Sequence, residues 1–288
     1  MDYEKFSSIL NKHIFEGEKK ELLKKIAEKP ERFIGLFRPT KPGAKILQHI
    51  LQSHEIRFGD AFEEIIEEFL KEFGFQILSK SITDTTNKLL SLDQHFADGK
   101  IYYVIEQKIR DDHDSTKKDG QIINFEKKLD TLYKKYASNL VGIMYFLDPD
   151  LVKNKNFYLE KLREISSFYG IKTYLFYGKE LFEFFGHPEY WDQILIWLRR
   201  WKDNLPELPE INFDKNPEKS FEEIKDLDLR YWKRLFENEK LWEEGIIKSI
   251  FREGKTLRLL LKFFSSQKTT PFKNLATLLE QKIKHYFN

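Results

Sequence analysis

Apolar residues recur at helical spacing over the N-terminal third of the chain. The clearest run precedes Gly74 and consists of Phe62, Ile65, Ile66, Phe69, Leu70 and Phe73. Residues at steps of three and four lie on one face of a helix, so this run predicts a helix that begins after Gly59 and ends at Gly74. The same spacing predicts helices over residues 1–28 and 44–53, separated by a loop at residues 38–43.

The pattern then changes to that of extended strands. Apolar segments predict strands near residues 75–78, 89–96 and 101–110. The last two are joined through Asp98-Gly99, which favours a two-residue type I′ turn, because both central positions of that turn need a positive φ. Such a turn pairs residue 97 with 100 and residue 93 with 104.

Strand alternation brings polar side chains to one side of this predicted hairpin. The side chains that share it are Asp93, Val104, Glu106 and Lys108. The predicted pairing places Asp93 diagonal to Glu106, at a backbone distance of roughly 7–8 Å. Two carboxylates at that separation can lean onto one cation.

Helices and strands continue to alternate up to about residue 185. A helix is expected after Gly120, a buried strand at residues 140–147, a helix near 156–168 and a strand near 172–177. This order predicts an α/β fold with a mixed central sheet flanked by helices. We expect three consecutive parts: an N-terminal helical segment (1–54), an α/β core (55–185) and a mostly α-helical C-terminal subdomain (186–288) that carries the five tryptophans.

Composition limits the classes of protein that the chain can belong to. Cysteine is absent, which excludes disulfides, thiolate metal sites and cysteine nucleophiles, so any metal must bind oxygen or imidazole. No apolar run approaches the roughly 20 residues that a membrane span needs, and no secretory signal precedes the first helix, so we expect a cytoplasmic protein. The net charge of +2 neither indicates nor excludes a nucleic-acid partner.

One Glu-x-Lys triplet stands apart from the others in this chain. Glu106-Gln107-Lys108 ends an apolar strand, where charged groups are costly unless they have a partner or a task. Asp93, Glu106 and the main-chain carbonyl of Gln107 would offer oxygen ligands to Mg²⁺. Lys108 could orient or help to deprotonate a water that attacks a phosphodiester. The pattern therefore predicts metal-assisted hydrolysis.

These residues resemble the PD-(D/E)XK nuclease superfamily. Leu92-Asp93, twelve further residues and then Glu106-Gln107-Lys108 match its motif, with Leu in place of the usual Pro. The segment before the sheet resembles the acidic first helix of such nucleases, which implies an additional catalytic carboxylate. Glu63 lies nearest the apolar stripe of that helix and is the expected residue.

A longer resemblance covers residues 106–121, which look like the segment that follows the catalytic lysine in a group of type II restriction endonucleases. It implies that Arg110, Lys117 and Lys118 lie near DNA phosphates and that Gln121 lies near the metal site. It further implies a magnesium-dependent, sequence-specific endonuclease that cuts double-stranded DNA, leaves 5′-phosphate ends and acts as a homodimer. No phosphate-binding loop of the GxxxxGK[ST] kind is present, so no nucleotide cofactor is expected.

Other interpretations fit some of the same residues. Asp93, Glu106 and Lys108 could form a cross-strand salt bridge on a surface hairpin, and Glu63 could be a solvated helix residue. His95 shares the face of Asp93 but fits a polar hairpin end, and the tryptophans fit a core better than base stacking. Spaced basic residues (Arg252, Lys255, Arg258 and Lys262) fit a phosphate contact and a solvated helix face equally well. At the level of function, a repair or recombination nuclease and a non-catalytic DNA-binding protein remain alternatives.

Overall fold

The computed structural model describes residues 1–35 and 37–287, which form two compact units. Unit 1 comprises Met1–His13 and Phe58–Leu205, and unit 2 comprises Ile14–Arg57 and Pro206–Asn288. Each unit is therefore built from two separate stretches of the chain. The three consecutive parts expected from the sequence, with boundaries near residues 54 and 185, stay a prediction.

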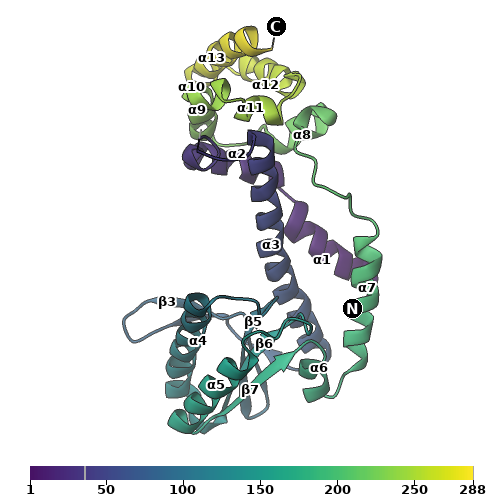
Figure 1. Ribbon diagram of the computed structural model, residues 1–288, viewed down its shortest axis with the longest axis vertical. Helices are drawn as coiled ribbons and strands as arrows, with labels where there is room; N and C mark the ends of the chain where they lie inside the picture. Colours follow the sequence, from purple (N-terminus) through teal and green to yellow (C-terminus); the bar gives the residue numbers. More distant parts are fainter. Residues whose placement is uncertain (36, 288) are drawn as a thin grey trace. The chain divides into compact units, whose positions relative to one another are not determined.

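Unit 1 contains a five-stranded mixed sheet (Figure 1). Its strands, in spatial order, are β1 (Gln76–Ile77), β4 (Gln94–Asp98), β5 (Ile101–Lys108), β6 (Leu140–Phe146) and β7 (Lys172–Tyr177). The first three are antiparallel, and β5, β6 and β7 run parallel. A separate two-stranded sheet pairs β2 (Ser81–Thr83) with β3 (Leu89–Ser91).

The described residues of unit 1 form six helices in whole or in part. They are α1 (Tyr3–Phe15), α3 (Pro42–Glu72) from Phe58 onward, α4 (Ser115–Tyr136), α5 (Lys155–Tyr169), α6 (Glu180–Phe184) and α7 (Glu189–Lys202), with a 3-10 turn at Ala137–Asn139. Helices α4 and α5 lie side by side on one face and share a buried core with β5 and β6 (Figure 1). The predicted fold class, a mixed sheet flanked by helices with a mostly helical C-terminal part, is confirmed.

The register of the β4–β5 hairpin differs from the prediction by two residues. Asp98 pairs with Ile101 and His95 with Val104, so the turn residues are Gly99 and Lys100. Gly99 occupies the first central position with a φ of 57°, as a type II′ turn requires, and the predicted type I′ turn at Asp98-Gly99 is wrong. A slip of two residues leaves every side chain on its predicted face, because the side-chain period of a strand is two.

Two helices that the sequence predicts separately are one. Helix α3 runs through Gly59 without a break, although glycine costs about 1 kcal/mol inside a helix relative to alanine. The apolar stripe that follows Gly59 is almost fully buried, with Phe62 and Ile65 at 1% and 0% exposure. Burial of that stripe outweighs the weak helix propensity of one glycine.

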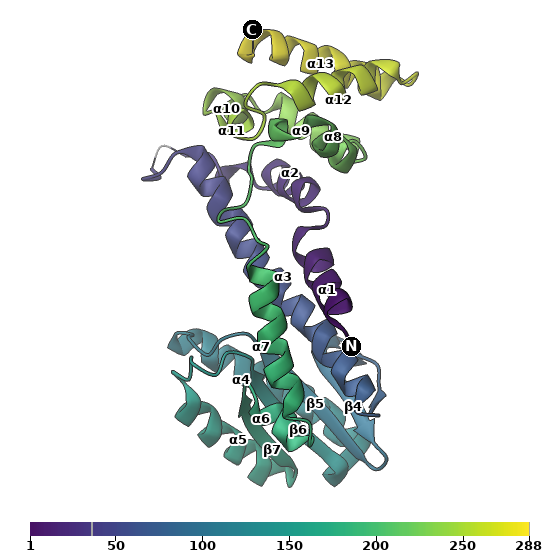
Figure 2. The same ribbon diagram turned by 90° about the vertical axis from the view of Figure 1, so that its right-hand side faces the viewer.

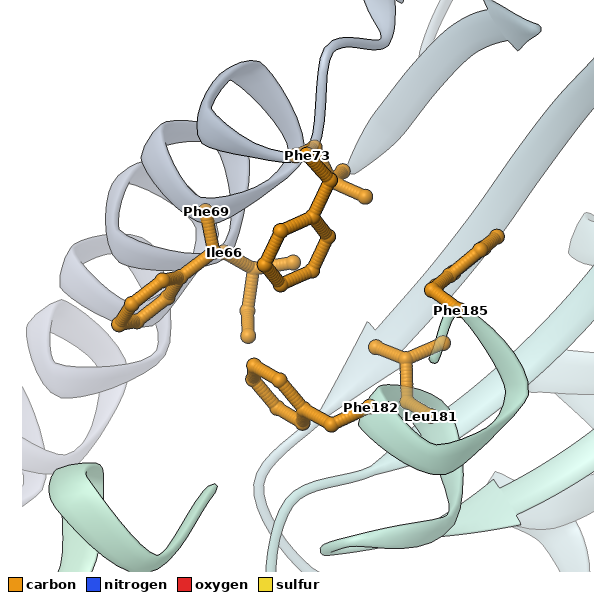
Figure 3. Close-up of a pocket in the computed structure, with 7 residues that line it drawn as sticks. Ile66, Phe69, Phe73, Leu181, Phe182 and Phe185 are labelled. Atoms are coloured by element: carbon orange, nitrogen blue, oxygen red, sulfur yellow. The ribbon is translucent and has the colours of Figure 1, made fainter. Parts of the chain in front are cut away.

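A small apolar gap lies between α3 and α6 (Figure 3). Phe69 of α3 and Phe73, which follows that helix, lie near Phe182 of α6, and Ile66, Leu181 and Phe185 also line the gap. The ring centroids of Phe69 and Phe182 are 5.8 Å apart, and the two ring planes are nearly perpendicular. Every residue around the gap is apolar, so it is a feature of core packing and offers no polar group to a ligand.

Unit 2 is all helical. Besides the first part of α3 it contains α2 (Glu18–Glu28), α8 (Pro217–Ile224), α9 (Leu229–Glu237), α10 (Glu239–Glu243), α11 (Ile246–Ile250), α12 (Lys255–Ser266) and α13 (Thr270–Tyr286), with 3-10 turns at Pro30–Arg32 and Phe213–Lys215. Helices α12 and α13 lie side by side in both orientations (Figure 2).

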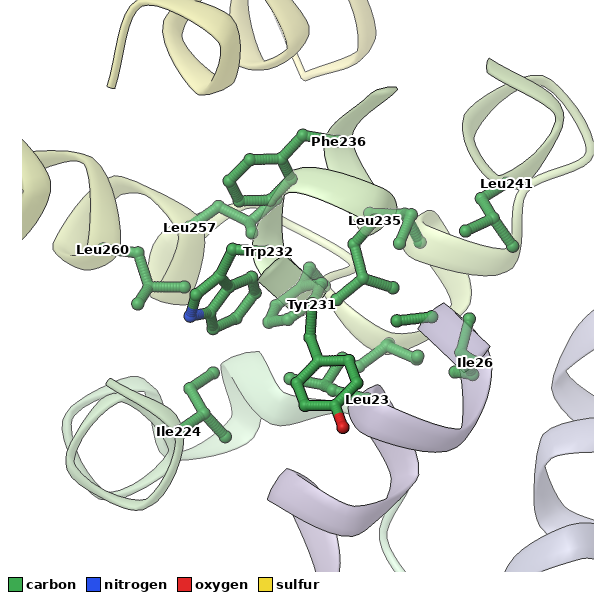
Figure 4. Packing of buried hydrophobic residues seen from close by; sticks show 14 of the residues in the cluster. Leu23, Ile26, Ile224, Tyr231, Trp232, Leu235, Phe236, Leu241, Leu257 and Leu260 are labelled. Carbon is green, nitrogen blue, oxygen red and sulfur yellow. The ribbon is translucent and has the colours of Figure 1, made fainter. Parts of the chain in front are cut away.

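The core of unit 2 is centred on α9. Trp232, with 0% exposure, packs among Leu257 and Leu260 of α12 and Ile224 of α8, and Leu23 of α2 lies close by (Figure 4). Four of the five tryptophans are buried: Trp191, Trp201, Trp232 and Trp242. The interpretation of the tryptophans as core residues is confirmed.

Candidate active site

Asp93 and Glu106 lie beside each other at one end of the hairpin. The observed register pairs residue 94 with 105, so Asp93, one residue before β4, faces Glu106 of β5 across the ladder rather than diagonally. The main-chain N–H of Gln107 donates a 2.8 Å hydrogen bond to Oδ2 of Asp93, which fixes this carboxylate at the edge of β5. Glu106 is only 3% exposed.

The ammonium group of Lys108 gathers the oxygen atoms of this site. Its Nζ lies 3.1 Å from Oδ2 of Asp93, 2.8 Å from Oε1 of Glu106 and 2.7 Å from the main-chain oxygen of Gln107. Burial lowers the pKa of Lys108, but the attraction of Glu106 and Asp93 outweighs it, and the net effect raises the pKa. The three oxygens therefore converge on one positive charge.

Glu63 of α3 lies within electrostatic range of the same carboxylates. Burial, followed by repulsion from Asp93, raises its pKa from 4.5 to about 7, against the opposing attraction of Lys80 and Lys108. Gln94 of β4 ties the helix to the sheet, because its side-chain Nε2 donates a 2.7 Å hydrogen bond to the main-chain oxygen of Glu63. The structure thus brings Glu63 together with Asp93 and Lys108, as the sequence predicts.

A second lysine, which is not among the residues predicted from the sequence, completes the cluster. Lys128 of α4 is 5% exposed, and its Nζ lies 2.5 Å from Oε2 of Glu106 and 3.8 Å from Oδ1 of Asp93. It lies on the apolar stripe of α4, between Phe125 and Leu132. A lysine at such a position must have a buried partner, and this is the signal that could have identified it.

Gln107 contributes its main chain to the site and its side chain to the opposite face of the sheet. The side chain is 4% exposed, and neither its amide nitrogen nor its amide oxygen has a hydrogen-bond partner among the described residues. Only its main-chain N–H and carbonyl face the carboxylates.

His95 shares the face of Asp93 but lies away from the charged cluster. It is 4% exposed, it makes a 2.7 Å hydrogen bond through Nδ1 with the main-chain oxygen of Ser79, and its ring packs against Tyr136. Burial lowers its pKa. These contacts make it a core residue rather than a polar hairpin end.

The segment after β5 is held by a buried carboxylate. Asp111, with 0% exposure, accepts hydrogen bonds from the main-chain N–H and the side-chain Nδ2 of Asn154, both at 2.8 Å, and from the Tyr177 hydroxyl at 3.0 Å. Asp114 then caps α4 by accepting a 2.9 Å hydrogen bond from the N–H of Lys117. The helix therefore begins at Ser115, before the start after Gly120 that the sequence predicts.

The residues expected to contact DNA lie in this segment or in the first turns of α4. Lys117 is exposed, and the ammonium of Lys118 lies 4.3 Å from the ring centroid of Phe157. The side-chain oxygen of Gln121 accepts a 2.7 Å hydrogen bond from the Tyr158 hydroxyl. Arg110 is partly buried. Their roles toward DNA, and the position of Gln121 near a metal, stay predictions.

The donor set fits a hard divalent cation. No group of three or more His, Cys, Asp or Glu side chains arranged for a metal occurs in residues 1–35 and 37–287. Two carboxylates and one main-chain carbonyl nevertheless meet at the Lys108 ammonium, which shows that these oxygens can share one positive charge. Mg²⁺ is bound in proteins by one or two carboxylates and retained waters, so this set is chemically sufficient.

A family described as "Type II restriction endonuclease, HinfI" matches residues 2–88 and 74–202. The chain belongs to the HinfI family of type II restriction endonucleases. No curated protein matches it. The two matched segments contain every member of the charged cluster: Glu63, Asp93, Glu106, Lys108 and Lys128.

Membership of the HinfI family makes the chain a sequence-specific DNA endonuclease and a DNA-binding protein. The resemblance to type II restriction endonucleases that the sequence shows is therefore confirmed at the level of the family. Residues 203–288, which hold most of unit 2, lie outside the matches. Over the part of the chain that the structure describes, no helix combines the length and apolar character of a membrane span.

Proposed function

We propose that the chain cuts double-stranded DNA in a Mg²⁺-dependent reaction carried by Asp93, Glu106 and Lys108, with Glu63 as an additional carboxylate. The observation that supports this most directly is the convergence of Asp93, Glu106 and the carbonyl of Gln107 on one ammonium group. A surface salt bridge does not account for it, because Glu106 is almost completely buried.

In the proposed reaction Asp93, Glu106 and the Gln107 carbonyl would hold the cation. The chemistry that a bound Mg²⁺ supplies is a lower pKa for its coordinated water and balance of charge at the phosphate. The side chain of Lys108 is 28% exposed, so its ammonium can leave the carboxylates and orient the attacking water. Glu63 has a pKa of about 7, which lets it exchange a proton near neutral pH.

Contacts to DNA are proposed for Arg110, Lys117, Lys118 and Gln121, which follow β5 or open α4. The N-terminus of a helix favours anions, and Lys117 and Lys118 lie in the first turn of α4. Unit 2 adds a second source of positive charge: it contains 26 lysines and arginines against 20 aspartates and glutamates, whereas unit 1 contains 23 against 27. We propose that unit 2 contributes to DNA binding through phosphate contacts.

The proposed products carry 5′-phosphate ends, and the proposed active form is a homodimer. A duplex has two strands of opposite polarity, and a two-fold pair of active sites matches that symmetry at a palindromic site. Sedimentation of the protein with and without DNA tests the dimer, and ligation of the fragments without prior phosphorylation tests the ends.

Cleavage of unmethylated phage DNA tests the proposal as a whole. Reactions contain Mg²⁺, Ca²⁺ or EDTA, and compare the wild type with Asp93→Asn, Glu106→Gln and Lys108→Met. The control is Asp98→Asn, which removes an exposed carboxylate from the same hairpin. Discrete fragments are expected with Mg²⁺ for the wild type and the control, and a loss of at least 100-fold for the three site variants.

Three other results of this experiment would contradict the proposal in whole or in part. A smear in Mg²⁺ would indicate a nuclease without sequence preference, as in repair. Binding of DNA without cleavage in any cation would indicate a non-catalytic protein. Full activity of any one site variant, with its fold intact by circular dichroism, would remove that residue from the proposed mechanism.

A further inference from the structure

Lys128 is buried and contacts the carboxylate oxygens that Lys108 does not contact. Its ammonium contacts Oε2 of Glu106 at 2.5 Å, whereas Lys108 contacts Oε1 of the same carboxylate at 2.8 Å. Both oxygens of Glu106 are thus paired with lysines. Lys128 also lies 3.8 Å from Oδ1 of Asp93, the oxygen that neither Lys108 nor Gln107 uses.

The two lysines differ in how freely they can move. The side chain of Lys108 is 28% exposed, whereas that of Lys128 is 6% exposed and lies within the packed face of α4 beside Leu129. Moving the ammonium of Lys128 away from Glu106 would leave it in an apolar environment, which is costly for a charge. Lys108 can reach solvent or substrate, and Lys128 stays where it is.

We propose that Lys128 is a positioning residue: a buried cation that holds Glu106 in place and limits the affinity of the site for divalent cations. This inference rests on the proposed metal site at Asp93 and Glu106. Once Lys108 has moved away, Lys128 is the cation that balances the carboxylates of Asp93 and Glu106. Without Lys128, this poorly solvated pair of carboxylates would carry excess negative charge. The Lys128 ammonium repels a divalent cation a few ångströms away, and this repulsion is strong at low dielectric. Removal of that ammonium would therefore make a divalent cation bind more tightly.

Calorimetric titration of Ca²⁺ into the metal-free protein, without DNA, tests the inference. The variants are Lys128→Met, which keeps the length of the side chain and removes its charge, and Lys128→Arg, which keeps the charge. The matched control is Lys134→Met, on the same helix, where the exposed lysine pairs with Asp130 instead.

Lys128→Met is expected to bind Ca²⁺ at least tenfold more tightly than the wild type, and the arginine and Lys134 variants to stay within threefold. A lysine with only a structural role would lower the melting temperature and leave the Ca²⁺ affinity unchanged. Unchanged or weaker binding by Lys128→Met would overturn the proposal.

A second variant covers the case in which Lys128→Met does not fold. Lys128→Met combined with Glu106→Gln removes both members of the ion pair, and this double variant should fold with a melting temperature above that of Lys128→Met. A double variant that melts no higher than Lys128→Met would also overturn the inference. Neither measurement needs cleavage of DNA. If the wild type does not cut DNA, the proposed function is rejected, but the Ca²⁺ affinities and melting temperatures still decide the role of Lys128.

Discussion

Replacing Glu63 by glutamine should stabilise the protein at alkaline pH. The folded structure removes the Glu63 carboxylate from water and places it near Asp93, which raises its pKa from 4.5 to about 7. A carboxyl group whose pKa is raised by folding binds protons more tightly in the folded state. Its contribution to stability is therefore full below pH 4.5 and is lost as the pH rises through about 7.

The size of this loss follows from the difference between the two pKa values. A pKa of about 7 against 4.5 corresponds to a free energy on the order of 3 kcal/mol above neutral pH. Glu63 is partly exposed, and solvent screening reduces the value to roughly 2 kcal/mol. Glutamine has nearly the same shape and no charge, so the variant avoids this cost.

Urea unfolding in EDTA at pH 4, 6 and 8 measures the effect. The advantage of Glu63→Gln over the wild type should be small at pH 4, increase through pH 6 and reach roughly 2 kcal/mol at pH 8. Glu67→Gln, one turn along the same helix, is the control with the opposite sign. Burial acts to raise the pKa of Glu67, but its hydrogen bonds with Lys71 and Lys80 lower it overall, so loss of its charge should destabilise the protein above pH 4.5.

A Glu63→Gln variant that is no more stable than the wild type at pH 8 would refute a raised pKa for Glu63. A difference in stability that stays constant from pH 4 to pH 8 would also refute it, because a constant difference would come from packing rather than from the titration of Glu63.

Three further substitutions test other parts of the structure by urea unfolding. Gln107→Met should raise the free energy of unfolding by about 1 kcal/mol, since the buried amide has no hydrogen-bond partner in the described residues; a lower midpoint would contradict this. Trp232→Ala should lower it by about 3–5 kcal/mol, because the side chain is fully buried in the core of unit 2, and a loss below 1 kcal/mol would show that the core is loosely packed. Gly99→Ala should cost about 1 kcal/mol through its φ of 57° alone, as an added Cβ meets no atom within 4 Å; an unchanged midpoint would argue against this turn.

The sequence was sufficient to predict that Asp93, Glu106 and Lys108 share one face of the hairpin, although not the register of its strands. A turn at Asp98-Gly99 and a turn at Gly99-Lys100 both put Gly99 at a position that needs a positive φ. Local turn preferences therefore do not decide between the two registers. The choice between them depends on how β4 packs against β1 and β5. Since the two registers differ by an even number of residues, Asp93, Glu106 and Lys108 share a face in both.

Lys128 could not be assigned to the site from spacing alone. Its place between Phe125 and Leu132 on the apolar stripe indicates a buried lysine, but it does not identify the partner of that lysine. Its pairing with Glu106 depends on where α4 lies against β5, and that is a tertiary contact between residues 22 positions apart. Secondary-structure patterns carry no information on such contacts.

The grouping of residues 14–57 with the C-terminal helices was equally beyond the sequence pattern. Amphipathic helices show which face is buried, but the pattern does not show what covers it. Helix α2 is amphipathic, and its buried residues Leu22, Leu23 and Ile26 pack in the same core as α9.

Unit 2 cannot close until long after its first helix has been made. The Tyr231 hydroxyl of α9 donates a 3.1 Å hydrogen bond to Glu28 of α2, across 203 positions of the chain. At ribosomal speeds of about 5–20 residues per second, α2 waits roughly 10 to 40 seconds for this partner. During that interval the apolar face of α2 lacks this partner, while the strands of the sheet, residues 76–177, are synthesised. Synthesis therefore completes the nuclease core before the helical unit.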